Sequence, residues 1–184
     1  NEYEDPVLLV LPADHLIQDN QAFHESIRVA NTLAETNKLI TFGIKPSKAE
    51  TGYGYIQADI VNTEKYYKVQ SFTEKPNQEN ASRYLESGNF FWNSGMFMFK
   101  ASVYLEEINK FAPEILKCCK KALPTENVDL DFIRLKSKEF LKCPNQSIDY
   151  AVMEHTKEAI VMPLDANWSD IGSWDALMES KTKD

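Results

Sequence analysis

Two continuous runs of apolar residues near the start of the chain predict strands that are buried on both faces. These runs cover residues 7–11 and 39–44, and a Lys-Pro pair ends the second one. Between them, Asn20 can cap a helix. Apolar side chains recur at helical spacing after this cap, at Phe23, Ile27, Ala30 and Ala34. A strand, a helix and a strand in this order predict a parallel βαβ unit.

The middle of the chain alternates apolar and polar residues more openly. Residues 55–61 and 66–72 predict strands with one face in water, whereas residues 95–99 are too apolar for an exposed strand. A short helix is expected over residues 77–87, because Gly88 follows in a position typical of a helix C-terminus.

The C-terminal half becomes helical and then returns to a strand. Pro113 breaks or restarts the first helical segment, and a second helix is expected over residues 130–141. Ser147 caps a third helix that runs to about His155, and residues 159–164 follow as a strand. The buried stripe expected in the first segment consists of Val103, Ile108, Phe111, Ile115 and Leu116. The sequence therefore predicts a single α/β unit with an inserted helical portion.

Composition and charge narrow the classes of partner. The 184 residues are 43% hydrophobic, which is enough to bury a core, and the formal net charge is -8. The 20 lysines and arginines are scattered, so a nucleic-acid partner is not expected, because a polyanionic backbone rewards basic patches. This charge distribution is compatible with a small phosphate ligand, because one or two lysines and a metal can bind such a ligand locally.

The number and spacing of the cysteines and the hydropathy pattern predict the cell compartment of the protein. Cys118, Cys119 and Cys143 are an odd number without zinc-ligand spacing, which favours a reducing compartment. No apolar stretch approaches the roughly 20 residues of a membrane span, and the acidic N-terminus lacks the basic region of a secretory signal. These features predict a cytoplasmic protein without a membrane partner.

Two aspartates stand where apolar strands end, at opposite ends of the chain. Asp14 closes the run that begins at Val7, and Asp170 lies among glycine and tryptophan residues. Ligands bind at the carboxyl ends of strands in α/β sheets, and two converging carboxylates suit a hard cation such as Mg²⁺. For Asp170, a hydrogen bond to nearby backbone or to an indole N–H is the structural alternative.

Further candidate groups each have a structural alternative. Lys75 could bind a phosphate while Glu74 accepts sugar hydroxyls, but both need a local kink to reach one ligand, and an exposed charged pair explains them as well. Asn93 interrupts an apolar run and could bind sugar hydroxyls or be a satisfied core asparagine at a β-bulge. Residues 51–55 form a glycine-punctuated loop that fits a ligand or a tight turn. Asp149 opens a helix, where helix capping alone would favour it.

The identity and order of these segments resemble the bacterial mannose-1-phosphate guanylyltransferases over nearly the whole chain. The matching blocks are Pro12-Ala13-Asp14-His15, Thr51-Gly52-Tyr53-Gly54-Tyr55-Ile56, Phe72-Thr73-Glu74-Lys75-Pro76, Trp92-Asn93-Ser94-Gly95-Met96-Phe97, Ser147-Ile148-Asp149-Tyr150-Ala151-Val152-Met153-Glu154 and Trp168-Ser169-Asp170-Ile171-Gly172-Ser173-Trp174. The resemblance implies a Rossmann-like mixed β-sheet flanked by helices, the nucleotide-diphospho-sugar transferase fold. It also implies synthesis of GDP-mannose and pyrophosphate from GTP and mannose 1-phosphate with Mg²⁺.

The resemblance also implies a role for each matching position. Asp14 and Asp170 match the two metal-binding aspartates, and Lys75 matches the lysine that holds the sugar phosphate. These three are the expected catalytic residues. The positions expected to contact the substrate are Tyr53, Gly54, Glu74, Asn93, Asp149 and Gly172.

One segment of the family pattern is missing. The glycine-rich Gly-Gly-x-Gly-Thr-Arg-Leu loop, which cradles the triphosphate, occurs nowhere in the sequence. Residues 1–184 are therefore expected to be the central and C-terminal part of one N-terminally truncated nucleotidyltransferase domain. The sugar half of the site should be present without most of the nucleotide half, so the chain alone is expected to be inactive.

Two other interpretations stay open. The chain could belong to another hexose-1-phosphate nucleotidyltransferase, although His15 and the Ser-Ile-Asp-Tyr block favour the mannose branch. It could also be a non-catalytic sugar-nucleotide-binding subunit, against which the intact Asp14, Lys75 and Asp170 count. The resemblance permits a homodimer, and it permits a cupin-like isomerase domain after Asp184.

Overall fold

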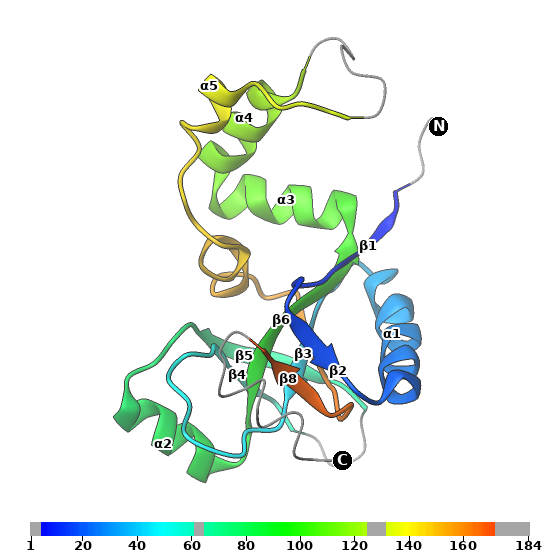
Figure 1. The fold of residues 1–184 in the computed structure, drawn as a ribbon, viewed down its shortest axis with the longest axis vertical. Helices are drawn as coiled ribbons and strands as arrows, with labels where there is room; N and C mark the ends of the chain where they lie inside the picture. Colours follow the sequence, from blue (N-terminus) through cyan, green and yellow to red (C-terminus); the bar gives the residue numbers. More distant parts are fainter. Residues whose placement is uncertain (1–4, 61–64, 125–131, 172–184) are drawn as a thin grey trace. The chain divides into compact units, whose positions relative to one another are not determined.

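The computed structural model describes residues 5–60, 65–124 and 132–171. The chain forms two compact units, which are traced in Figure 1. The sheet unit consists of Asn1–Ala101 and Lys157–Asp184, and the helical unit consists of Ser102–Thr156. The helical unit interrupts the sheet unit along the sequence, which confirms the predicted inserted helical portion.

A six-stranded mixed sheet and a separate two-stranded ribbon build the sheet unit. The strands are β1 (Val7–Val10), β2 (His15–Ile17), β3 (Leu39–Ile44), β4 (Tyr55–Ala58), β5 (Tyr67–Thr73), β6 (Phe90–Lys100), β7 (Ala159–Pro163) and β8 (Trp168–Asp170). The sheet has the order β1-β6-β3-β7-β5-β4, with a further pairing between β6 and β4. Strands β3 and β7 pair in parallel and the other neighbours in the sheet are antiparallel. Strands β2 and β8 form the ribbon.

Helix α1 (Asn20–Ala34) packs its apolar stripe on the sheet. Its N-cap is Asp19, whose carboxylate accepts a hydrogen bond from the Ala22 amide at 2.9 Å. The predicted cap, Asn20, is instead the first residue of the helix. The buried core at this face consists of Ala30, Ala34, Ile40, Phe42, Met96, Met98, Ile160, Met162, Leu164 and Ala166.

Strand β1 is an edge strand, which corrects the prediction that residues 7–11 are covered on both faces. Its side chains alternate between half-buried and exposed, and Leu8, Val10 and Leu11 are all exposed. Among the described residues its one neighbour is β6, which lies between β1 and β3. Since β6 is antiparallel to both, β1 and β3 are parallel, as the βαβ prediction requires, but they are not adjacent.

Strand β4 also differs from its prediction. Tyr55, Ile56 and Ala58 are buried, so β4 has no wet face, and it ends at Ala58. The reason is tertiary, because Tyr84 of α2 (Gln78–Ser87) packs on Tyr55 with ring centroids 5.3 Å apart. Strand β5 alternates more openly, as predicted.

Helix α2 confirms the predicted short helix and its end. The Asn77 side chain caps it by accepting a hydrogen bond from the Asn80 amide at 2.9 Å. Gly88 ends it with a φ of 73°, a left-handed conformation that glycine adopts without steric cost.

The helical unit confirms the first predicted helical segment and corrects the second. Helices α3 (Ala101–Phe111) and α4 (Pro113–Ala122) meet at Pro113, as expected. The second predicted helix is reduced to α5 (Ser137–Phe140), and residues 132–136 are not helical. Phe132 and Ile133 expose 64% and 69% of their surface, so this segment lacks the buried apolar face that stabilises a helix.

The third predicted helix is short and irregular. Residues Asp149–Met153 form a π-helical turn, η1, which does not extend to His155. No side-chain hydrogen bond caps η1, so the capping role expected for Ser147 is wrong.

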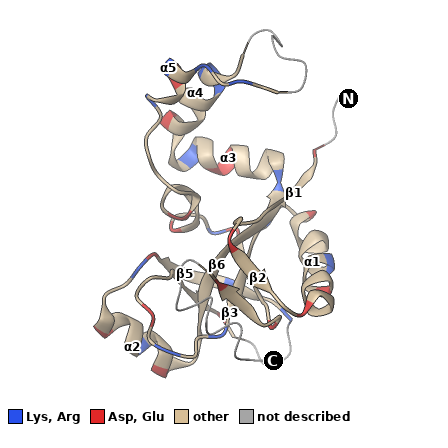
Figure 2. Ribbon diagram, in the orientation of Figure 1, with Lys and Arg blue, Asp and Glu red and all other residues tan. Residues whose placement is uncertain are grey.

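The charged residues are scattered in the structure, as the sequence predicted. Figure 2 shows acidic and basic residues interspersed along the elements of each unit. Within the described residues, no helix is long and apolar enough to span a membrane.

Candidate active site

The β2–β8 ribbon brings together the two aspartates from opposite ends of the chain. His15, which follows Asp14, lies directly opposite Asp170 in the antiparallel register. The Ile171 amide also donates a hydrogen bond to the Asp14 carbonyl oxygen at 3.2 Å. Asp14 is exposed and Asp170 is half-buried. The structure therefore brings the backbones of Asp14 and Asp170 side by side at one end of the ribbon, and the convergence of their carboxylates on one ion stays a prediction.

His15 and Trp168 support this ribbon. The Trp168 indole Nε1 donates a hydrogen bond to His15 Nδ1 at 3.1 Å, and the rings meet edge to face with centroids 5.1 Å apart. An accepting Nδ1 leaves the proton of the neutral imidazole on Nε2. Burial lowers the pKa of His15 below its ordinary value of 6.5, although the nearby Asp170 and Asp14 raise it.

A second cluster joins three of the positions expected to contact the substrate. The Asn93 amide of β6 donates a hydrogen bond to the Gly54 carbonyl oxygen at 2.7 Å. A Cβ atom placed on Gly54 would lie 2.5 Å from Glu74 Oε2 and 3.2 Å from Asn93 Cβ. Gly54 therefore has to be glycine for Glu74 and Asn93 to lie this close. We call Gly54, Glu74 and Asn93 the cradle.

The Asn93 side chain agrees with the structural alternative, an asparagine whose polar groups the protein satisfies, and its contact with sugar hydroxyls stays a prediction. Its Oδ1 accepts hydrogen bonds from Thr41 Oγ1 and from the Gly95 amide, each at 3.1 Å. The β3–β6 register shifts between Thr41 and Gly43, and Gly95 has a φ of 72°. Asn93 is thus held by the protein at a β-irregularity, and it remains half-buried at the cradle.

Lys75 has the kink that the sequence predicted would be needed. Its φ of 47° is left-handed, which turns the chain away from the alternation of a strand. The Lys75 Nζ lies 3.7 Å from Glu74 Oε1, so the consecutive side chains reach the same side. The Lys75 side chain is 63% exposed and that of Glu74 is 12% exposed. The lysine can therefore meet a ligand from solvent while the carboxylate is held in the cradle.

Tyr53 connects the cradle to the ribbon. Its ring centroid lies 5.3 Å from that of Trp92 in β6 and 5.6 Å from that of Trp168 in β8, both in edge-to-face contacts. Since Gly54 follows Tyr53 and Trp168 contacts His15, one continuous set of contacts joins the two clusters. The structure therefore brings together Asp14, Tyr53, Gly54, Glu74, Lys75, Asn93 and Asp170.

The two remaining expected residues lie outside the described part of the sheet unit. Asp149 lies on η1 of the helical unit, and its predicted contact with the hexose stays a prediction. Gly172 lies outside the described residues. The loop before Tyr53 is held by Glu50, whose carboxylate accepts a hydrogen bond from the Gly52 amide at 3.1 Å, so this part of the glycine-punctuated segment is turn chemistry.

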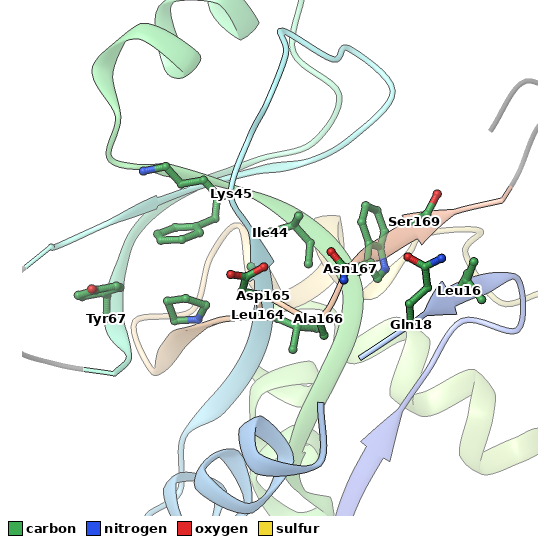
Figure 3. A pocket seen from close by; sticks show the side chains of 14 residues that line it. Leu16, Gln18, Ile44, Lys45, Tyr67, Leu164, Asp165, Ala166, Asn167 and Ser169 are labelled. Carbon is green, nitrogen blue, oxygen red and sulfur yellow. The ribbon is translucent and has the colours of Figure 1, made fainter. Parts of the chain in front are cut away.

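A cavity of about 610 Å³ lies beside these clusters, at the carboxyl ends of the parallel strands β3 and β7 (Figure 3). The ribbon contributes Leu16, Trp168 and Ser169 to its lining. The cavity adjoins the cradle through Gly43, which is paired with Asn93 in the sheet register.

Sequence reasoning missed the supporting roles of His15 and Trp168. Both residues stand inside the recognised blocks, but their contact depends on the pairing of β2 with β8. The signal in the sequence is that His15 follows Asp14 and that Trp168 stands two residues before Asp170. This signal can be interpreted only when the register of β2 and β8 is known.

A mixed sheet with carboxylates, a lysine and polar groups gathered at its strand ends is typical of enzymes that handle phosphorylated ligands. The chain belongs to the nucleotidyl transferase family, whose model matches residues 1–184.

The curated relatives of the chain indicate a narrower group within this family. The chain is 53% identical to a mannose-1-phosphate guanylyltransferase of Salmonella typhimurium over 180 residues, which cover 98% of the chain and 38% of the relative. It is 51% identical to that of Escherichia coli K12 over 179 residues, with coverage of 95% and 37%. The resemblance to this group is confirmed, and the chain spans less than half the length of these curated relatives.

Solved structures confirm the fold class. A protein of Thermus thermophilus described as a mannose-1-phosphate geranyltransferase matches with a TM-score of 0.82 and 30% identity, over 97% of this chain and 50% of that one. A mannose-6-phosphate isomerase of Helicobacter pylori matches with a TM-score of 0.80 and 37% identity, over 89% and 64%. A UDP-glucose pyrophosphorylase, at 17% identity and a TM-score of 0.57, shows a similar fold.

Proposed function

We propose that the whole protein is a mannose-1-phosphate guanylyltransferase and that this chain supplies the half of its site that binds the sugar phosphate. The reaction joins GTP and mannose 1-phosphate to give GDP-mannose and pyrophosphate. One observation supports it above the others: the cradle, Lys75 and the paired aspartates come from separate blocks and are linked in one unit. The relatives' names support the choice of mannose.

The cradle supplies recognition of the hexose. The Glu74 carboxylate accepts hydrogen bonds from sugar hydroxyls, and the half-buried Asn93 presents polar groups beside it. Gly54 allows the ligand and the chain to approach closely, because it carries no side chain between them. Tyr53 and Gly172 are proposed as wall residues around the hexose, and the contact of Asp149 with the hexose stays a proposal.

Lys75 supplies a positive charge for the phosphate. An ammonium group is a compact point charge that suits a phosphate oxygen, and the exposed Lys75 side chain can reach one next to the cradle. Binding by Glu74 and Lys75 together would fix the sugar and its phosphate at once. This arrangement holds the attacking phosphate oxygen in a fixed direction.

Asp14 and Asp170 fit a Mg²⁺ ion. Both present hard oxygen donors at adjacent strand ends of the ribbon, and one is exposed enough for water and substrate oxygens to complete the coordination. A bound Mg²⁺ would neutralise charge on the reacting phosphates. His15 stays a neutral support between the two carboxylates because the Trp168 N–H occupies its Nδ1.

The reaction needs no nucleophile from the protein. A phosphate oxygen of mannose 1-phosphate attacks the α-phosphorus of GTP, a new P–O bond forms, and the bond to pyrophosphate breaks. The work of the protein is positioning and charge neutralisation, which Lys75, Asp14 and Asp170 provide. We also propose a cytoplasmic location and a homodimer for the whole protein.

Binding and turnover test this proposal separately. Titration of the 184-residue chain with mannose 1-phosphate should show binding that is tighter than that of glucose 1-phosphate. In the whole protein, pyrophosphate release should require GTP, mannose 1-phosphate and Mg²⁺ together. Preference for glucose 1-phosphate with UTP would replace the mannose assignment. Sugar-nucleotide binding without turnover in the whole protein would support the binding-subunit interpretation.

A further inference from the structure

The three thiols of the chain gather at one place in the helical unit. Cys118 and Cys119 are consecutive residues of α4, and Cys143 follows α5. All three are free and half-buried. The Cys143 thiol interacts with the thiols of Cys119 and Cys118. Neither the family fold nor the proposed reaction uses this cluster.

Several hydrogen bonds fasten the Cys143 turn to α4. The Lys136 amide donates to the Ala122 carbonyl oxygen at 2.8 Å, which joins the start of the α5 segment to the end of α4. The Cys143 thiol donates to the Ile115 carbonyl oxygen at 4.0 Å, and the Cys118 thiol donates to that of Lys142 at 3.7 Å. The cluster is therefore held by both of the segments that carry its cysteines.

A metal site explains this cluster poorly. In the described part of the chain, no group of three or more histidine, cysteine, aspartate or glutamate residues is arranged to hold a metal ion. A disulfide, in contrast, needs only one of the two α4 cysteines.

We propose that Cys119 and Cys143 form a reversible intramolecular disulfide, which makes the cluster a redox modification site. Two neighbouring thiols have to approach each other to reach the disulfide length of about 2.05 Å. Cys119 is the preferred partner because the Cys143 thiol donates to the Ile115 carbonyl oxygen, one helical turn before Cys119, whereas the Cys118 thiol donates to the Lys142 carbonyl oxygen.

The oxidant is a hydroperoxide such as hydrogen peroxide. The Cys119 thiolate attacks one peroxide oxygen, so an S–O bond forms, the O–O bond breaks, and the released hydroxide takes a proton to become water. The Cys143 sulfur then attacks the sulfenic acid; the S–S bond forms, the S–O bond breaks, and a second water leaves with the Cys143 proton. Two thiols are oxidised and one peroxide is reduced to two waters.

The environment assigns the order of these steps. Burial and the neighbouring thiols of Cys119 and Cys118 raise the pKa of Cys143. A thiol that keeps its proton attacks peroxide slowly, so Cys143 acts as the resolving partner. The disulfide would close a loop that includes α5 and should raise the stability of the helical unit against urea.

Peptide mapping tests the disulfide directly. The whole chain is treated with hydrogen peroxide, its remaining thiols are alkylated, and tryptic peptides are weighed with and without reduction. The expected product is an intramolecular link between the Cys143 peptide and the peptide that holds both α4 cysteines, and dithiothreitol should reverse it. Because trypsin leaves Cys118 and Cys119 on one peptide, serine variants identify the partner.

The variants decide between the outcomes. Cys118→Ser is the matched control and should keep the link, whereas Cys119→Ser should reduce its yield at least about tenfold. The urea midpoint of the helical unit should rise on oxidation in the wild type and in Cys118→Ser. The proposal is overturned if Cys143 stays fully alkylatable after peroxide, if it links only to another chain, or if Cys118→Ser abolishes the link and Cys119→Ser does not.

Discussion

The two halves of the candidate site rest on different supports. The cradle of Gly54, Glu74 and Asn93 is carried by the six-stranded sheet, where β4 is paired along both edges by β5 and β6. Asp14 and Asp170 stand on a two-stranded ribbon of three residue pairs. Two-stranded ribbons are marginally stable by themselves, whereas a strand with two neighbours is held along its length.

This contrast separates binding of the sugar from binding of the metal. The cradle is arranged by backbone pairing and close packing before a ligand arrives, so it should bind the sugar phosphate without reorganisation. The ribbon depends on two side-chain contacts of Trp168, with His15 and with Tyr53. We expect changes in the cradle to affect sugar-phosphate affinity and changes in the ribbon to affect Mg²⁺ affinity, and the following predictions test this separation.

Asp170→Asn should have the largest effect. The amide keeps the shape but loses the negative charge, so Mg²⁺-dependent turnover in the whole protein should fall by about 10³-fold. Affinity for mannose 1-phosphate in the absence of Mg²⁺ should change little. Asp59→Asn, at an exposed position, is the control. If turnover survived in Asp170→Asn, the metal role of Asp170 would be abandoned.

Lys75 allows charge and backbone strain to be separated. Lys75→Gly and Lys75→Ala both remove the ammonium group, and each should lower kcat/KM for mannose 1-phosphate by about 10²-fold. Because residue 75 has a φ of 47°, the glycine variant should be more stable than the alanine variant by about 1 kcal/mol. Urea unfolding measures this difference. Equal stabilities would show that the kink carries no strain.

Gly54→Ala tests the close packing of the cradle. The added methyl would lie 2.5 Å from Glu74 Oε2, so Glu74 has to move. Overpacking of this kind costs about 1–3 kcal/mol of folding stability, and the displacement of Glu74 should also weaken sugar-phosphate binding, which calorimetry measures. Gly52→Ala is the matched control, because its nearest contact is 3.4 Å away. Equal losses in both variants would contradict the cradle.

Trp168→Phe tests the support of the ribbon. The substitution removes the hydrogen bond to His15 but keeps an aromatic ring, at a cost of about 1 kcal/mol. Mg²⁺ affinity should fall by about fivefold, while binding of mannose 1-phosphate without metal should not change. If Trp168→Phe weakened only the binding of mannose 1-phosphate, the assignment of metal binding to the ribbon would be wrong.

His15 should give the ribbon a small dependence on pH. Because burial lowers the pKa of His15, the unfolded chain binds a proton more readily than the folded chain does. The stability from neutral His15 is thus complete above the ordinary value of 6.5 and is lost as the pH falls through the lowered pKa. Urea midpoints measured from about pH 8 to about pH 5 should decline more steeply in the wild type than in His15→Gln. His24→Gln, on the exposed side of α1, should behave like the wild type.

Local signals in the sequence predicted much of the fold correctly. Strand β3 matches residues 39–44, and helix α2 begins after Asn77 and ends at Gly88, because strand hydrophobicity and helix caps are set by neighbouring residues. Predictions that depended on distant residues were less accurate. The burial of β4 and the exposed face of β1 depend on which elements lie next to them, and the helix expected over residues 130–141 lacks a buried face at Phe132 and Ile133.

The candidate site shows the same division. The sequence by itself determined which residue types are available: two acids at strand ends, a Glu-Lys pair that needed a kink, and an asparagine in an apolar strand. Only the tertiary structure decided that Asp14 and Asp170 share a ribbon, that Gly54 touches both Glu74 and Asn93, and that Trp168 supports His15. The physical reason is that strand register joins residues far apart in the chain, and register is fixed by packing of the whole sheet.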